Sequence, residues 1–336
     1  MKTIALIFGS TDSEHDVSVL SAQSVFDNFP KDKFKMLPIY ITKDGVWTSG
    51  QYTSESFTNQ NFPKESEYYF KFDKNKKGLY DLKTQKQVDI DGAMLMLHGP
   101  VGEGGSIQGL LELANIPFVG SKLTSSAICM DKAFTHQICE KEGIKMAKYD
   151  LVLKGQDFDT SNKTYPLVVK PSREGSSFGI SYVENEAELI KALDFAFEFD
   201  SRVLIEEYIL AQELSVAVLK TKKEMIVSKP CQATRFKPIA DYDEKYVSTE
   251  QETLFDLPYS QSVLDKVVED SGFIFNLLEC DHLSRIDFFI TEDESVYFNE
   301  INTIPGFTKS SLYPMMMEKE GISYGDMLTR MFEDIV

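Results

Sequence analysis

Short apolar runs alternate with helical patterns at the start of the chain. Residues 3–8 form an apolar run that ends at Gly9, and residues 17–26 then repeat apolar side chains at helical spacing. Residues 34–41 read as a second strand, where Pro38 indicates an edge position because proline cannot donate a ladder hydrogen bond. This β-loop-α-β order predicts the opening of a parallel sheet.

The alternation continues to about residue 120. Residues 48–88 are polar and tyrosine-rich, and we expect them to form an excursion on the sheet. The buried strand AMLMLHG (residues 93–99) then runs into the glycine-rich GPVGEGGS and a helix over residues 107–113. A first α/β domain over residues 1–120 follows from this order.

The remaining chain continues with helices and strands and has no repeats. We expect helices over residues 131–141 (capped by Asp131), 186–199 and 260–278, and strands over residues 165–170, 202–209, 214–220 and 225–230. A hairpin near residue 290 and a C-terminal helix complete the pattern. The fold class is therefore α/β with some α+β elements.

Length and charge narrow the choice of function. A chain of 336 residues is too long for one ordinary core, so it should contain two or three domains. The net charge of -18 argues against a nucleic-acid partner. No apolar run is long enough to span a membrane, and the N-terminal run is too short for a signal peptide. The four scattered cysteines indicate reduced thiols, so we expect a cytoplasmic protein.

The stretch RIDFFITEDESVYFNEIN reads as a hairpin that carries polar side chains. If the chain turns at residues 293–294, Asp287 faces Glu300 and Arg285 faces Asn302, with all four side chains on one face. Two carboxylates and an amide supply oxygen ligands for a hard cation such as Mg²⁺. A salt-bridged surface hairpin is the alternative, although the apolar neighbours argue against it. The turn also lacks glycine, so the register could slip.

A second set of residues could surround a nucleotide. Residues 173–179 offer glycines, serine hydroxyls and backbone N–H groups between two strands, as a loop over phosphates would, although an ordinary hairpin tip is the alternative. Lys132 and Lys170 could neutralise phosphate charge. Backbone groups beside Glu207 and Ile209 could read an adenine edge, with a carboxylate on the ribose.

Eight motifs in order resemble those of one family. They are FGSTDSEHDVS, LHGPVGEGGSIQGLLELANIPFVGS, MDK, YPLVVKPSREGSSFGIS, VLIEEYI, DYDEKY, RIDFF and NEINTIPGFTKSSLYP. The chain resembles the D-alanine–D-alanine ligases of the ATP-grasp superfamily, with only residues 45–90 matching weakly. The resemblance implies a three-domain ATP-grasp architecture, with an N-terminal parallel-sheet domain (1–120), a central domain (121–209) and a C-terminal domain (210–336).

The resemblance also implies a role for individual residues. ATP would be bound by Lys132, Lys170, Ser176, Ser177, Glu206, Glu207, Tyr208, Ile209, Glu213 and Lys245. Two Mg²⁺ ions, or Mn²⁺, would be bound by Asp287, Glu300 and Asn302. The catalytic residues would be Glu14, Ser176, Tyr246, Arg285 and Gly306, and the substrate would contact Glu14, His98, Ser311 and Leu312. The four histidines form no metal site by their spacing.

The implied reaction joins two D-alanine molecules at the expense of ATP, for peptidoglycan precursor synthesis. One D-alanine carboxylate attacks the γ-phosphate to give an acyl phosphate, and the amine of the second attacks its carbonyl. A tyrosine at position 246, linked through Ser176 to Glu14, goes with D-alanine as the second substrate. A homodimer is expected, with no membrane partner.

Two alternatives and two departures from the family pattern qualify this interpretation. One alternative is a D-alanine–D-serine ligase of the same family, some of which resemble this chain at Phe178, although Phe178 could simply pack the loop. The other is a catalytically silent nucleotide-binding paralogue. Such a paralogue would not need the intact set of charged site residues. The family often has G-G where this chain has Gly9-Ser10, and G-E-D-G where it has G-E-G-G at residues 102–105. The missing aspartate at position 104 leaves the substrate-ordering role of that loop in doubt.

Overall fold

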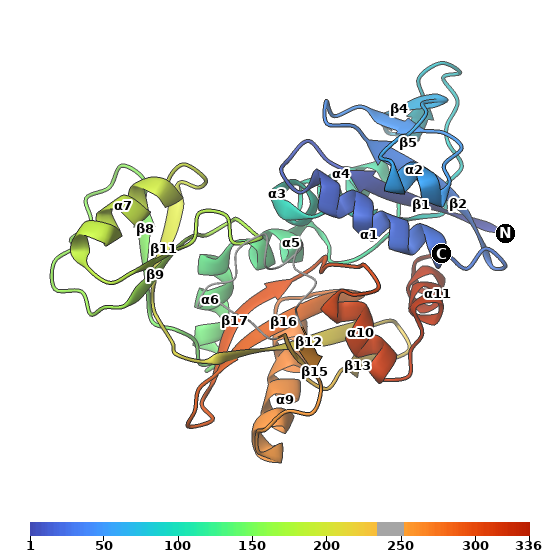
Figure 1. Ribbon diagram of the computed structural model, residues 1–336. Coiled ribbons are helices and arrows are strands. Elements are labelled where there is room, and N and C mark those ends of the chain that lie inside the picture. The colour runs from blue at the N-terminus through green and yellow to red at the C-terminus, as the bar shows by residue number, and fades with distance from the viewer. Residues whose placement is uncertain (234–251) are drawn as a thin grey trace.

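The computed structural model describes residues 1–233 and 252–336, and its first sheet has seven strands (Figure 1). Their order is β5 (Lys76–Asp81), β4 (Ser66–Asp73), β3 (Trp47–Ser49), β2 (Phe34–Ile41), β1 (Lys2–Gly9), β6 (Gly92–Met96) and β7 (Phe118–Val119). Strands β2, β1, β6 and β7 are parallel, as expected. Strands β3 to β5 are antiparallel additions, so the sheet is mixed rather than parallel throughout.

Those three added strands are the polar segment expected only as an excursion. Antiparallel strands need only short connections, which suits this tyrosine-rich stretch. Strand β2 is an inner strand, yet it pairs with β3 only at Tyr40 and Ile41. The predicted edge position of this strand was therefore wrong, although Pro38 itself has a partner only in β1, Leu6, and lies before the part of β2 that pairs with β3.

Helices cover this sheet and lead away from it. They are α1 (His15–Asp27), α2 (Ser54–Thr58), α3 (Gly99–Glu103) and α4 (Ser106–Ala114), followed by α5 (Leu123–Met130) and α6 (Lys132–Lys141). Asp131 caps α6 as predicted, accepting the N–H groups of Ala133 and Phe134.

The central sheet stands apart from the others, at the left of Figure 1. Its strand order is β10 (Ser181–Val183), β9 (Leu167–Pro171), β11 (Arg202–Glu207) and β8 (Tyr149–Leu153). Helix α7 (Glu186–Ala196) packs on β9 and β10, and Leu189, Val169 and Val203 lie in a core of their own.

The third sheet carries the hairpin. Its order is β13 (Met225–Val227), β12 (Gln212–Lys220), β16 (Leu283–Ile290) and β17 (Val296–Asn302), with α9 (Gln261–Leu277) packed against it. A small sheet pairs β14 (Gln232–Ala233) with β15 (Thr253–Leu254). Helices α10 (Leu312–Lys319) and α11 (Tyr324–Ile335) end the chain.

The last two helices share a core with the first sheet. Met316 and Phe332 lie in the same apolar cluster as β1, and the Phe332 ring contacts Phe29 and Phe34. The loop after β17 is therefore held close to the N-terminal part of the chain. No helix within the described residues is both long and apolar enough to cross a membrane. The division at residues 120 and 209 stays a prediction.

Candidate active site

The hairpin has the predicted register where its polar residues lie. Asp287 faces Glu300 and Arg285 faces Asn302, as expected. Beyond Asp287 the register shifts by one, so that Phe288 faces Phe298 and Asn299 is the extra residue of a bulge. The turn is accordingly longer than predicted: Thr291 N–H bonds to Ser295 O at 3.1 Å. The predicted two-residue turn was wrong. The bulge at Asn299 compensates for the longer turn, so that Asp287 still faces Glu300.

Asp287 is the centre of a polar cluster on β16 and β17. Its side chain is buried, and its two oxygens accept three bonds of 2.8–3.1 Å from the Arg285 guanidinium. Ser215 Oγ donates to Asp287 at 2.6 Å, and Asn302 Nδ2 donates at 3.1 Å. In this structure the positive charge that balances Asp287 comes from Arg285.

The donor chemistry of Asp287, Glu300 and Asn302 fits a hard cation, because all three side chains carry oxygen and lie on facing strands. No group of three His, Cys, Asp or Glu side chains within residues 1–233 and 252–336 could hold a metal ion. A cation here would therefore depend on the Asn302 amide oxygen as well as on the two carboxylates.

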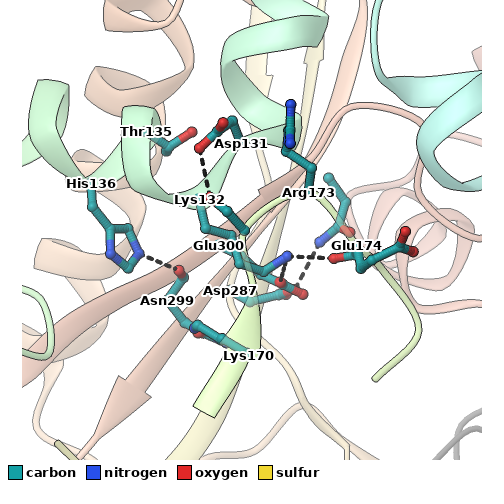
Figure 2. A network of polar contacts seen from close by, with 12 residues as sticks. Asp131, Lys132, Thr135, His136, Lys170, Arg173, Glu174, Asp287, Asn299 and Glu300 are labelled. Carbon is teal, nitrogen blue, oxygen red and sulfur yellow. Dashed lines mark hydrogen bonds and ion pairs between the residues drawn. The ribbon is translucent and has the colours of Figure 1, made fainter. Parts of the chain in front are cut away.

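Lys132 brings the start of α6 to this cluster (Figure 2). Its Nζ lies 3.6 Å from Glu300 Oε2 and donates to the backbone carbonyl of Glu174 at 2.7 Å. Lys132 is positioned by the junction before α6, where its N–H bonds to Ser172 O at 2.9 Å. Asp131 also accepts a bond from Ser172 Oγ at 2.6 Å, so the helix start is fixed to the end of β9.

Lys170 reaches the same region from β9, but it is almost fully buried. Its Nζ lies 2.7 Å from Glu206 Oε2 on β11. His136 Nδ1 lies 3.7 Å from the other oxygen of Glu206, and His136 Nε2 lies 3.2 Å from the Asn299 carbonyl. Burial lowers the pKa of His136, against the opposing effect of Glu206. The bulge residue Asn299 thus links the hairpin to α6.

The loop over residues 173–179 is anchored at its start and strained at its middle. Arg173 N–H donates to Asp200 at 2.9 Å, and the Arg173 guanidinium pairs with the same carboxylate. Ser176 and Ser177 have φ values of 49° and 63°, a region that favours glycine. Two adjacent serines in this conformation suggest a functional constraint on the loop.

The expected adenosine residues lie at the end of β11 and the start of β12. Strand β11 ends at Glu207, two residues earlier than predicted, so Tyr208 and Ile209 belong to the connection. Glu207 Oε1 accepts Lys148 N–H at 3.0 Å, and the Tyr208 ring packs edge-on against Tyr182. Glu213 faces Phe289 across the β12–β16 ladder.

The expected amino-acid residues come from both ends of the chain. Glu14 is buried beside α1, and its carboxylate lies within 3.3 Å of the positions where side chains at Gly99 and Gly175 would begin. His98 is buried at the N-cap of α3, just after β6, and both of its ring nitrogens lie near protein partners, Ser21 and Ile304. The Glu14 carboxylate therefore lies between two glycine-containing segments, one at Gly99 and the other at Gly175.

Gly306 and Ser311 lie close together after β17. A Cβ at Gly306 would stand 3.1 Å from Ser311 Oγ. Ser311 is the N-cap of α10, which begins at Leu312, and its hydroxyl accepts Thr308 N–H at 3.0 Å. Lys245 and Tyr246 lie outside the described residues.

Four residues that the structure brings to the site had no role there predicted from the sequence. Glu103 was noted only as part of a glycine-rich motif, and Glu174 lay within the loop without a role. His136 was considered only as one of four histidines that form no metal site, and Asp131 only as a helix cap. Each of the four residues contacts a segment that is distant in sequence, so a local pattern could not identify it. Asp131 is the exception in part, because its position before a helix marked it as a cap.

Comparison with known families covers most of the chain. Residues 3–121 match the model described as the D-ala D-ala ligase N-terminus, and residues 138–333 match the D-ala D-ala ligase C-terminus. Among curated proteins, the D-alanine–D-alanine ligase of Clostridium novyi is 38% identical over 99% of this chain and 97% of its own length. That of Caldicellulosiruptor bescii is 37% identical over 98% of this chain and 93% of its own length.

Solved structures give the same result for the fold. The VanG D-Ala:D-Ser ligase from Enterococcus faecalis has a TM-score of 0.89 and 35% identity, covering 100% of this chain and 99% of its own. The D-alanine–D-alanine ligase from Bacillus anthracis in complex with ATP has a TM-score of 0.75 and 27% identity, covering 100% and 97%. The expected ATP-grasp fold is confirmed, and the chain belongs to the D-alanine–D-alanine ligase family of enzymes.

Proposed function

We propose that this enzyme joins two D-alanine molecules into D-alanyl-D-alanine and converts ATP to ADP and phosphate. The observation that carries the proposal is the convergence of Lys132, Lys170 and Arg285 on the carboxylates of the β16–β17 hairpin and β11. Three cationic side chains gathered in one region of a chain whose net charge is -18 can provide a binding site for a polyphosphate. The relatives named D-alanine–D-alanine ligase support the choice of substrate.

The phosphates would lie between Lys132 and the loop of residues 173–179. Lys132 is the more accessible of the two lysines, because 11% of its side chain is exposed against 6% for Lys170. The N–H groups and hydroxyls of Ser176 and Ser177 would close over the phosphates and exclude water. Asp287, Glu300 and Asn302 would hold Mg²⁺, which would screen phosphate charge and orient the γ-phosphoryl group.

The first amino acid would be bound by Glu14, whose buried carboxylate attracts an ammonium group. Its carboxylate oxygen attacks the γ-phosphorus, the bond to the bridging oxygen breaks, and ADP leaves. Arg285 would stabilise the negative charge in this step, because its guanidinium projects from the same hairpin as the proposed Mg²⁺ ligands and would be released from Asp287 when a cation takes its place there.

The second amino acid would place its carboxylate at Ser311 and Leu312. These residues begin α10, and a helix N-terminus favours an anion. Its uncharged amine attacks the acyl carbonyl, the C–O bond breaks with its electrons going to the departing phosphate, and the nitrogen loses one proton, which the phosphate can take up. The Gly306 N–H and Arg285 would stabilise the oxyanion of the tetrahedral intermediate.

D-Serine is the second candidate for the second substrate, because a D-Ala:D-Ser ligase is among the similar structures and Phe178 stands in the loop. We favour D-alanine because Tyr246 follows Lys245, although both lie outside the described residues. The test is product analysis with ATP and equal D-alanine, D-serine and D-lactate. We expect D-alanyl-D-alanine to dominate, and Tyr246→Phe to admit D-lactate. A product that is mostly D-alanyl-D-serine would overturn this choice.

The expected homodimer and cytoplasmic location stay predictions. Light scattering of the purified protein at micromolar concentration tests the first, since a dimer has twice the mass of the 38.1 kDa chain.

A further inference from the structure

The loop after β17 is held by two residues from the N-terminal part of the chain. Ile304 N–H donates to Glu103 Oε2 at 3.2 Å, and the Ile304 carbonyl lies 3.0 Å from His98 Nδ1. Ile304 is 4% exposed, so water does not compete for these bonds. Both polar groups of one residue are therefore fixed by side chains about two hundred positions away in sequence.

The contacts of His98 define its proton. A carbonyl only accepts, so Nδ1 carries the hydrogen and Nε2 accepts from the Ser21 hydroxyl, 2.8 Å away. Burial lowers the pKa of His98 to about 4, which keeps the ring neutral and this arrangement intact at neutral pH. Ser21 Oγ in turn accepts Phe307 N–H at 3.4 Å. The loop is thus held on both sides of Gly306.

Glu103 connects two segments with one carboxylate. Its Oε1 accepts Gly99 N–H at 3.2 Å while Oε2 holds Ile304. Burial, and then the charge of Glu14, raise the pKa of Glu103 to about 8. The neighbouring Gly104 could not take over this role, because a Cβ there would lie 2.3 Å from Pro100 O. An aspartate at that position would require the backbone to shift.

We propose that Glu103 and His98 are positioning residues for the ligation step, which fix Ile304 and thereby the direction of the Gly306 N–H. Ile304 lies two residues after Asn302 and two before Gly306, so a shift of its peptide groups moves the oxyanion donor. This inference rests on the proposed function of Gly306. It gives His98 an indirect role instead of direct contact with the substrate.

Two substitutions at His98 separate the bond to Ile304 from the bond to Ser21. In His98→Asn the amide nitrogen can stand where Nδ1 stands and keep the bond to Ile304. In His98→Gln the longer side chain places its polar atoms near Nε2 and loses that bond. We expect His98→Asn to keep kcat within about threefold and His98→Gln to lower it about tenfold or more, since a misplaced catalytic group can cost about 100-fold.

Glu103→Gln tests the contact of Glu103 with Ile304. Each oxygen of the Glu103 carboxyl group can accept an N–H whether or not the group is protonated, whereas the NH₂ group of glutamine cannot accept and would face an N–H donor. We expect kcat for dipeptide formation to fall about 100-fold, with the KM for D-alanine within about threefold. Glu112→Gln is the matched control. Glu112 also accepts a backbone N–H, that of Leu123 at 3.1 Å, but on the exposed side of α4.

Two further measurements distinguish positioning from a general loss of structure. Positional isotope exchange in ATP with D-alanine reports acyl-phosphate formation, and we expect Glu103→Gln to retain it while dipeptide formation falls. Hydrogen exchange of the peptide over residues 303–307 should accelerate in Glu103→Gln and not in Glu112→Gln. This second readout does not depend on catalysis.

Several outcomes would overturn the inference. One is kcat unchanged in Glu103→Gln, and another is equal activity of His98→Asn and His98→Gln. A parallel fall of both half-reactions together with the melting temperature would make the role structural. If the unmodified enzyme forms no dipeptide, the proposed function fails. In that case, unchanged exchange over residues 303–307 would remove the positioning contact as well.

Discussion

Two lysine–carboxylate pairs stand at the candidate nucleotide site, and they differ in burial and in geometry. Lys170 Nζ lies 2.7 Å from Glu206 Oε2, with only 6% and 5% of the two side chains exposed. Lys132 Nζ lies 3.6 Å from Glu300 Oε2, with 11% and 26% exposed. The first pair is nearly enclosed by protein, whereas the second opens toward solvent.

This difference separates two roles for the same residue types. Removing one partner of a buried pair leaves a charge without compensation and costs about 3–5 kcal/mol. An exposed pair contributes only about 0–1 kcal/mol, because water and salt screen it. The Lys170–Glu206 pair therefore stabilises the end of β9 in addition to the role proposed for Lys170 at the phosphate site, whereas the more open Lys132–Glu300 pair is expected to matter for the ligand and little for stability.

The largest effect is expected when the Lys132–Glu300 pair is broken by replacing Glu300, and this effect should be on activity and not on stability. In Glu300→Gln the shape is kept while a ligand charge is lost, so kcat should fall at least 100-fold, which corresponds to about 3 kcal/mol or more. The free energy of unfolding should change by less than about 1 kcal/mol. Steady-state kinetics and urea denaturation give both values.

Glu292→Gln is the matched control for that experiment, because Glu292 is an exposed acid in the turn of the same hairpin. Near-normal turnover of Glu300→Gln at ordinary Mg²⁺ would contradict the metal assignment.

Breaking the buried pair should instead reduce stability. Lys170→Met leaves the Glu206 carboxylate buried without its cation, so the free energy of unfolding should fall by about 3–5 kcal/mol. Adding Glu206→Gln removes the remaining charge and should recover most of that loss. Lys191→Met, an exposed lysine on α7, is the control in urea titrations. A double variant as unstable as the single one would show that packing, not charge, governs this position.

The contrast between these regions also marks what the sequence could predict. The pairing of Asp287 with Glu300 followed from the alternation of side chains along two adjacent strands. The turn did not follow, because TEDES contains no glycine to signal its geometry, and Glu294 adopts a φ of 61°. The bulge at Asn299 offsets the longer turn, and no local pattern announces such a residue.

Contacts between distant segments were beyond sequence reasoning. Glu103 and Ile304 are 201 positions apart, and their bond depends on how the C-terminal helices pack on the first sheet. Strand β4 was missed for a different reason. Its side chains from Ser66 to Lys71 are all half-buried, so the alternation that identifies a strand with one solvent face is absent.

The pH dependence of stability tests the region around the buried Lys170–Glu206 pair, through the neighbouring His136. Burial lowers the pKa of His136, so below about pH 6.5 the unfolded chain binds a proton that the folded protein does not. Stability should therefore fall with falling pH, by at most about 1.4 kcal/mol per pH unit from this group. His136→Gln keeps a donor for Asn299 and should show a shallower loss between pH 6.5 and 5. Equal slopes by urea denaturation would mean that His136 is not the group that titrates.

The smallest change in stability is expected at Lys132. Lys132→Met removes an ion pair of 3.6 Å that is partly exposed and one bond to the Glu174 carbonyl, so the free energy of unfolding should change by less than about 1 kcal/mol. The KM for ATP should nevertheless rise about tenfold or more, because the substituted side chain no longer neutralises phosphate charge. Lys141→Met, at the exposed end of the same helix, should leave both values unchanged. If Lys132→Met were as unstable as Lys170→Met, or if its KM for ATP stayed normal, the two pairs would not have the separate roles that their burial indicates.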